Sequence, residues 1–131
     1  MADTRPEADT CTLWGGALSL YTGKVRSYLI KKGVPYREFY ASHPDFQARI
    51  RPVVGLGVTP VLETPDGDIL QDSTEIIEAM ERRLPDRSMI PATPVLRALA
   101  WLLDAYGSEH LLAMAMHFRW AEPHITLQRS F

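Results

Sequence analysis

The sequence predicts an α/β fold in which a small mixed sheet carries packed helices and leads into a partial all-helical segment. Between residues 11 and 84, short apolar runs alternate with helix-periodic stretches in the order β-α-β-α-β-β-α. A proline-containing segment at 85–93 then precedes one long amphipathic stretch. A βαβ unit followed by a hairpin and a covering helix makes a mixed sheet, and this order is the thioredoxin-like arrangement.

The composition sets the class of protein. The chain has 131 residues, 46% hydrophobic and 23% charged, which is typical of one globular domain with an appendage. A net charge of -2 argues against nucleic acid as a partner. Cys11 is the single cysteine, which excludes an internal disulfide framework and favours a cytoplasmic location. Residues 1–10 are polar and predict a flexible tail, neither a signal peptide nor a membrane anchor.

The first elements form the predicted βαβ unit. Residues 11–21 predict a short buried strand and then a loop that begins at Gly15 and Gly16. Residues 22–33 predict a helix with Thr22 as its cap and Gly33 at its end. Residues 34–41 alternate well enough for a second strand.

A short helix and a hairpin come next. Residues 42–52 predict a helix that Ser42 caps and Pro52 terminates. Residues 60–64 and 68–71 predict two strands, joined through a turn that ends at Gly67. Pro60 stands in a run that otherwise resembles a strand interior, although proline lacks the backbone donor of that position. Such a proline belongs at an edge, a bulge or a cis peptide.

The last elements are helical. Asp72 and Glu75 have capping-box spacing and open a helix whose apolar positions run to Leu84. We expect domain 11–84, a linker at 85–93, and the start of an incomplete helical domain at 94–131, capped by Thr93. One helix cannot make a bundle core, so something else must cover its apolar face. We expect either that the chain is truncated or that it forms a homodimer that buries this face.

Two blocks of sequence resemble the glutathione transferase family. LSLYTGKVRSYLIKKGVPY (18–36) is similar to the family's first loop and helix, and VTPVLETPDGDILQDSTEII (58–77) to its third strand, hairpin and third helix. The resemblance, to the serine/cysteine-type subgroup, implies a glutathione-binding domain. It implies a cis bond between Thr59 and Pro60, with the Thr59 backbone facing the cysteinyl part of glutathione. Asp72 and Ser73 would then hold the γ-glutamyl group at a helix N-terminus, which favours a carboxylate.

The same resemblance points to Ser19 as the catalytic residue. Its spacing to Lys24 matches the family's serine and cysteine subgroups, and SLYT lacks the CxxC of a disulfide reductase. Ser19 would donate a hydrogen bond that favours the thiolate of glutathione, which attacks a small electrophilic substrate. The family's basic residue for the glycyl carboxylate has no clear counterpart, and Arg51 or His43 could substitute.

Other interpretations stay open at this point. Pro60 could be an ordinary trans proline, Asp72 a simple helix cap and Ser19 a loop serine that only satisfies local backbone. The protein could be a non-catalytic binding or assembly module of the same fold. The spacing of His110, His117 and His124 does not predict a metal site. Glutathione is therefore the only cofactor expected. No motif in the sequence identifies the electrophilic substrate.

Overall fold

A computed structural model describes residues 9–86 and 88–121. The chain divides into two compact units, one ending at Met89 and one beginning at Ile90, and each is described by itself. Within the described residues, no helix has both the length and the apolar character needed to span a bilayer.

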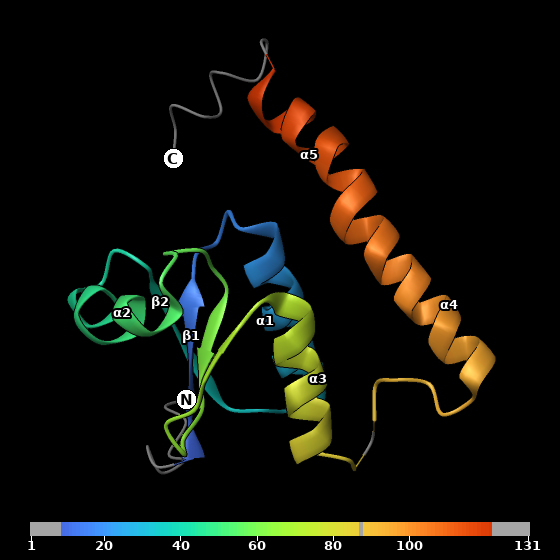
Figure 1. Cartoon of the computed structure of the whole chain (residues 1–131), viewed down its shortest axis with the longest axis horizontal. Helices are drawn as coiled ribbons and strands as arrows, with labels where there is room; N and C mark the ends of the chain where they lie inside the picture. Colours follow the sequence, from blue (N-terminus) through green and yellow to red (C-terminus); the bar gives the residue numbers. More distant parts are fainter. Residues whose placement is uncertain (1–8, 87, 122–131) are drawn as a thin grey trace, which may run out of the picture. The chain divides into compact units, whose positions relative to one another are not determined.

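The first unit is built on a four-stranded sheet with the order β2-β1-β3-β4 (Figure 1). The strands are β1 (Cys11–Gly15), β2 (Tyr36–Tyr40), β3 (Val61–Glu63) and β4 (Ile69–Gln71). β1 runs parallel to β2 and antiparallel to β3, and β4 is antiparallel to β3. Gly67 has a φ of 87° in the turn between β3 and β4, a value that glycine adopts without steric cost. The predicted mixed sheet and hairpin are confirmed.

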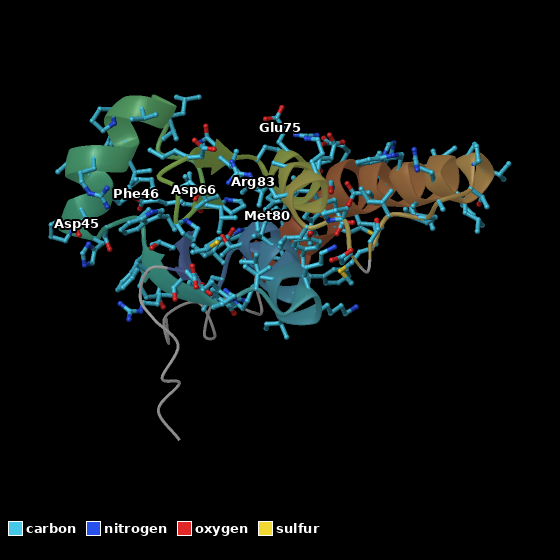
Figure 2. The ribbon with its side chains drawn as sticks, turned by 90° about the horizontal axis from the view of Figure 1, so that it is seen from below. Asp45, Phe46, Asp66, Glu75, Met80 and Arg83 are labelled. Carbon is cyan, nitrogen blue, oxygen red and sulfur yellow. The ribbon has the colours of Figure 1, made fainter. Side chains whose placement is uncertain are left out.

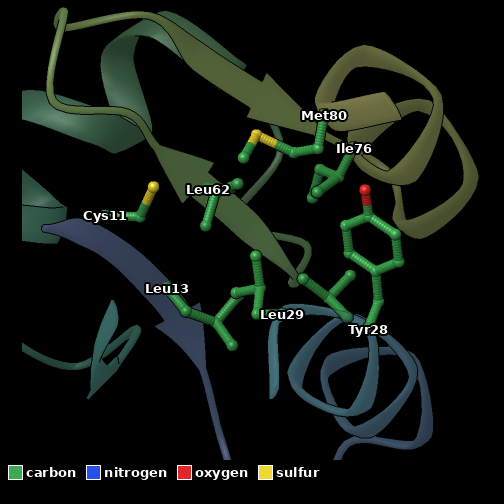
Figure 3. Packing of buried hydrophobic residues seen from close by; sticks show 8 residues of the cluster. Cys11, Leu13, Tyr28, Leu29, Leu62, Ile76 and Met80 are labelled. Carbon is green, nitrogen blue, oxygen red and sulfur yellow. The ribbon is translucent and has the colours of Figure 1, made fainter. Parts of the chain in front are cut away.

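Helices α1 (Leu20–Lys32) and α3 (Ser73–Arg83) cover one face of this sheet (Figure 1). Leu13 and Leu62 point from the strands toward them and are fully buried. The core between sheet and helices consists of Cys11, Leu13, Val25, Tyr28, Leu29, Leu62, Ile76 and Met80 (Figure 3). The helical apolar positions expected from the sequence therefore face the sheet, except that Leu84 is 39% exposed just beyond the end of α3.

A second, smaller core lies on the other face of the sheet. Trp14 and Val61 alternate with the residues of the first core and contact Phe46 and Ile50. Phe46 and Met80, labelled in Figure 2, belong to the two different cores. Phe46 and Ile50 come from a π-helical segment, η2 (Phe46–Ile50), that continues into α2 (Arg51–Val54).

The predicted end of this second helix was wrong. Pro52 does not terminate it, because the helix continues to Val54 with the proline in its first turn. The Arg51 N–H donates to the Phe46 carbonyl, five residues back, so the backbone has already left the regular α-helical ladder when it reaches Pro52. Proline has no N–H to offer such a ladder, and an irregular turn tolerates it.

The predicted cap of α1 was also wrong. Ser19, not Thr22, is the N-cap, and its Oγ accepts a hydrogen bond of 3.2 Å from the Thr22 backbone N–H. Thr22 is instead fully buried in the first turn. The end of α1 is as expected, since Gly33 has a φ of 75° and caps the helix in the left-handed conformation.

Glu81, near the end of α3, is the centre of a buried polar network. Its carboxylate accepts hydrogen bonds from Lys32 Nζ at 2.9 Å and from the Tyr28 hydroxyl at 2.8 Å. It also accepts from the Ser88 hydroxyl and the Met89 N–H. The network therefore joins α1, α3 and the chain beyond α3 through one charged group.

The second unit is a single continuous helical rod. It comprises α4 (Pro94–Ala105), the π-helical segment η3 (Tyr106–His110) and α5 (Leu111–Trp120). Thr93 is the N-cap residue as predicted, although its side chain makes no capping hydrogen bond. Within this unit many apolar side chains are exposed, among them Val95, Leu96, Leu99, Leu102, Leu103, Tyr106, Met114 and Phe118. His124 of the histidine set lies outside the described residues.

Candidate functional site

Three segments that are distant in sequence meet at one end of the sheet. The register pairs Trp14 with Val61 and Val61 with Gln71 across β1, β3 and β4. The loop that leads to Ser19 follows Trp14, the Thr59–Pro60 pair precedes Val61, and Asp72 follows Gln71. Figure 1 shows the N-terminal ends of α1 and α3 at this same end of the sheet. The fold thus brings the loop before α1, the loop before β3 and the start of α3 to one place.

The Thr59–Pro60 segment enters β3 with unusual backbone geometry. Its peptide bond is cis, and Pro60 is buried while Thr59 is partly exposed. Among the described residues, none hydrogen-bonds to the N–H or the C=O of Thr59. A backbone with free polar groups at a sheet end can pair with an extended peptide, as an added strand would.

Gln71 holds the loop in front of Thr59, a role that sequence reasoning missed. Its Nε2 donates to the Val58 carbonyl at 2.8 Å and to the Leu56 carbonyl at 3.3 Å. Only the hairpin register brings Gln71 opposite this loop, so no local sequence signal identifies it. The side chain fixes the direction from which the chain reaches Thr59.

Ser19 is the N-cap of α1 and also has a hydroxyl proton to donate. As the N-cap it accepts a hydrogen bond through a lone pair of Oγ, which leaves its O–H available as a donor. The residue is partly exposed, so a ligand at the helix N-terminus can reach it. The positive end of the α1 dipole adds to the preference for an anionic group at this position.

The start of α3 offers a second anion-favouring position. Asp72 caps the helix through Oδ1, which accepts from the Thr74 and Glu75 N–H groups at 2.8 and 3.2 Å, and Oδ2 has no part in the cap. Asp72 also has a φ of 75°, the only positive φ of a non-glycine residue within the described chain. Backbone strain of this kind is often found at ligand sites. Ser73 is only 3% exposed, and its hydroxyl makes no hydrogen bond to another described residue.

Lys24 connects the two helix N-termini. Its Nζ donates to the Thr74 Oγ1 at 2.9 Å, from the second turn of α1 to the first turn of α3. The sequence analysis used Lys24 only for its spacing to Ser19. Its contact with Thr74 joins residues 50 positions apart, and such a contact leaves no local pattern in the sequence. The ammonium adds positive charge beside a helix end that already attracts anions.

His43 and Arg51, which the resemblance suggests for the glycyl carboxylate of glutathione, lie just before α2 and at its start. The His43 ring contacts the Trp14 and Phe39 rings at tilted angles, and its Nδ1 accepts from the Asp45 N–H at 3.2 Å. Arg51 is exposed, and its Nη1 donates to the Gln47 side chain at 2.8 Å. Neither makes a contact that joins it to Thr59 or Ser73, so both assignments stay predictions.

The Ser19 hydroxyl, the Thr59 backbone and the start of α3 at Ser73 offer hydrogen-bond donors at one end of the sheet. Such a set is suited to a small, extended, acidic peptide. No group of three or more histidine, cysteine, aspartate or glutamate side chains within residues 9–86 and 88–121 could hold a metal ion.

Comparison with known proteins gives a consistent result. Residues 18–83 match the family model for the N-terminal domain of glutathione S-transferase. A search of curated proteins found no match. The matched range contains Ser19, the Thr59–Pro60 pair and the start of α3.

Similar solved structures point the same way. A glutathione S-transferase from Rhodospirillum rubrum F11 is 25% identical with a TM-score of 0.67, and the alignment covers 77% of this chain and 46% of that one. One from Methylobacillus flagellatus KT, crystallised with glutathione bound, is 26% identical with a TM-score of 0.66 and coverages of 86% and 57%. A Tau class enzyme from mango, Mangifera indica, is 25% identical with a TM-score of 0.70 and coverages of 86% and 51%. The chain spans about half the length of these structures.

Proposed function

The chain belongs to the glutathione S-transferase family, and from this membership we propose that it binds glutathione at the sheet end described above and ionises the thiol. The observation that carries the proposal is the convergence of Ser19, Thr59 and Ser73 on one end of the sheet through the register of β1, β3 and β4. A family relative of similar fold was crystallised with glutathione bound.

The backbone of Thr59 would hold the cysteinyl part of the ligand. Its N–H and C=O are free of partners among the described residues, and Gln71 keeps the preceding loop in place. Two backbone hydrogen bonds to the tripeptide would place its sulfur toward Ser19. Nothing in this step depends on a side chain of Thr59, so its substitution by serine should leave binding intact.

The start of α3 would bind the γ-glutamyl end. Its carboxylate would accept from the Ser73 hydroxyl and from the Ser73 backbone N–H, since the Thr74 and Glu75 N–H groups donate to Asp72, with the Lys24 ammonium close by. Its ammonium would pair with the Oδ2 of Asp72, which the helix cap leaves unused. One corner of the fold would then recognise both charges on the same carbon atom.

Ser19 would make the bound sulfur a nucleophile. A free thiol with a pKa of about 8.5 is only a few per cent ionised at neutral pH. A charge-assisted hydrogen bond from the Ser19 hydroxyl contributes about 1.5 to 3 kcal/mol to the thiolate, and the N-terminus of α1 about 0.3 to 1 kcal/mol. Together they would lower the pKa of the bound thiol by roughly one to three units. The thiolate would then attack a small electrophilic substrate.

The experiment that tests this proposal titrates the thiol of bound glutathione. Binding is measured by calorimetry, and thiolate absorbance is followed against pH in the wild type, Ser19→Ala and Ser19→Gly. Both variants remove the hydroxyl donor, but glycine is a far better N-cap than alanine, so only Ser19→Ala should also lower stability. We expect both to bind glutathione with a thiol pKa at least one unit higher. An unchanged titration in both would reject Ser19 as the activating residue.

A non-catalytic assembly module is the second candidate. The exposed apolar side chains of the rod from Pro94 to Trp120 favour it, because such a face is suited to protein contacts. Absence of glutathione binding in the calorimetric experiment would favour this function. In either case we propose that the protein is cytoplasmic and forms a homodimer.

A further inference from the structure

The opposite end of the sheet contains a cavity of about 760 Å³. Cys11, at the start of β1, lines it together with the chain that leaves α1, the turn between β3 and β4 and the end of α3. The register pairs Thr12 with Glu63 next to this turn, whereas Trp14 and Val61 pair at the glutathione end. The cavity is therefore separated from the proposed site by the length of the strands, so a ligand could occupy it whether or not the proposed function holds.

The floor of this cavity is apolar. Cys11 and Met80 line it at 2% and 4% exposure, and the partly buried Val34 packs beside them. Figure 3 shows Cys11, Leu62 and Met80 lying together in the same layer. Burial raises the pKa of the Cys11 thiol, although the nearby Arg83 charge lowers it in part. The thiol is thus a neutral, unpaired lining group and not a nucleophile.

The positive charges that line the cavity are already paired. Lys32 Nζ lies 2.9 Å from Glu81 Oε1 with its side chain only 3% exposed. Arg83 Nη1 lies 3.5 Å from Asp66, and Nη2 contacts Asp68. Figure 2, which views the molecule from this end, shows Asp66, Arg83 and Met80 close to one another. Among the described lining residues, an anionic ligand would find no uncommitted cation.

Among the described residues that line the cavity, the negative charges are in excess. Asp9 and Asp86 line the cavity and have no ion-pair partner within the described residues. Two free carboxylates above an apolar floor attract a positive charge and repel a negative one. The volume falls in the range of about 300 to 1,000 Å³ that is usual for sites of small organic ligands.

We propose that this cavity binds a small organic cation, a molecule with an apolar body and a positively charged nitrogen. The body would lie against Cys11, Val34 and Met80, and the charged nitrogen would face Asp9 and Asp86. Because these carboxylates are exposed, their attraction is screened by salt, so affinity falls as ionic strength rises. The floor supplies the part of the affinity that salt does not change.

Berberine is a suitable probe, because it is a flat apolar cation whose fluorescence rises in apolar surroundings. We expect one molecule to bind per chain at low ionic strength. Asp86→Asn should weaken binding about five-fold, and the double variant Asp9→Asn, Asp86→Asn about ten- to thirty-fold. Val34→Trp should abolish binding by filling the floor. Glu78→Gln, which removes an equal charge from an exposed pair on α3, should leave binding unchanged.

The amide signals of the full chain locate the probe. Berberine should shift the signals of Cys11, Val34 and Thr64 and leave Ser19, Thr59 and Ser73 unchanged, with or without saturating glutathione. The anionic dye 8-anilinonaphthalene-1-sulfonate should not produce these shifts. The proposal is overturned if berberine fails to bind, if glutathione displaces it, if the anionic dye binds equally well, or if Glu78→Gln weakens binding as much as Asp86→Asn. The aspartate variants are exposed substitutions, so this result does not depend on Val34→Trp folding.

Discussion

Gly15 shows how a single residue shapes the turn from β1 into α1. A Cβ built at this position would lie 2.3 Å from Thr22 Cγ2 and 2.4 Å from Thr22 Oγ1, much closer than side chains approach. Thr22 is fully buried in the first turn of α1, and its backbone N–H donates to Ser19 Oγ, so a shift of this turn would also move Ser19. The absence of a side chain at Gly15 is thus a condition for the position of the proposed catalytic hydroxyl.

We expect Gly15→Ala to destabilise the protein, because overpacking of a dense core costs typically about 1 to 3 kcal/mol. Urea unfolding measures the change. The double variant Gly15→Ala, Thr22→Ala should recover part of the loss, since it removes the atoms that would clash. Equal stability of Gly15→Ala and the wild type would show that the turn has more room than the structure indicates.

Thr22 itself leads to a second prediction at this scale. Its Oγ1 is completely shielded from solvent and, among side-chain atoms shielded to that degree in the described part of the chain, it alone has no hydrogen-bond partner. An unsatisfied buried hydroxyl costs about 1 to 3 kcal/mol. Thr22→Val keeps the shape and removes the hydroxyl, so we expect a higher melting temperature, measured by circular dichroism. Thr22→Ser keeps the unsatisfied group and loses a methyl contact, so it serves as the control and should lower stability.

At the scale of the element, the cap of α3 is separable from its proposed role in binding. Asp72→Ala removes the bonds to the Thr74 and Glu75 N–H groups and should lower the unfolding free energy by about 1 kcal/mol. Asp72→Asn keeps a capping oxygen and tolerates a positive φ, so its stability should stay near that of the wild type. It should nevertheless bind glutathione more weakly, because the charge that faces the ligand's ammonium is lost. Unchanged affinity in Asp72→Asn would limit Asp72 to helix capping.

Local sequence patterns predicted most elements of the first unit. They failed where a contact between distant residues determines how a helix begins or ends. The alternation of residues 34–41, the turn at Gly67 and the spacing of Asp72 and Glu75 each act within a few residues, so the sequence expresses them directly. The cap of α1 is different, because Thr22 is drawn into the core beside Gly15 and Ser19 takes its place. The continuation of α2 through Pro52 likewise depends on a π-helical turn that no sequence period reveals.

The candidate site shows the same division. The resemblance to a family placed Ser19, Thr59 and Ser73 in one site, and the sheet register brings them to one end of the fold. Gln71 and Lys24 were missed because their partners lie 13 and 50 residues away in the sequence. The cavity at the opposite end was missed for a similar reason, since it is formed only when the ends of α1, α3 and the hairpin come together.

At the scale of the whole molecule, Glu81 makes stability depend on pH. Burial works against its ionisation, but hydrogen bonds from Lys32, Ser88 and Tyr28 outweigh it and lower the pKa from 4.5 to about 2. A folded-state pKa below the unfolded value stabilises the protein above about pH 4.5, and this contribution is lost as the pH falls toward 2. A shift of this size corresponds to about 3 kcal/mol.

We therefore expect the unfolding free energy of the wild type to fall between about pH 5 and pH 2.5 more steeply than that of Glu81→Gln. Glu81→Gln should be less stable at neutral pH, because it leaves the Lys32 ammonium buried without its counter-charge. Urea unfolding at a series of pH values gives both slopes. Glu78→Gln, on an exposed pair, should keep the wild-type slope. Parallel curves for the wild type and Glu81→Gln would contradict the assignment.

The exposed apolar residues of the helical rod from Pro94 to Trp120 bear on the oligomeric state of the protein. Leu99 and Leu103, one turn apart on α4, are 49% and 61% exposed, and apolar surface of this kind is usually covered in a stable protein. If a second copy covers it, the wild type should sediment as a dimer at micromolar concentration. The double variant Leu99→Glu, Leu103→Glu should sediment as a monomer with the first unit still folded, because two buried charges per chain would oppose association. Arg97→Gln, which shifts the net charge by the same amount as one of these changes, should remain dimeric. A folded wild type that stays monomeric at every concentration would contradict the proposed homodimer, since nothing would then link the exposed leucines to self-association.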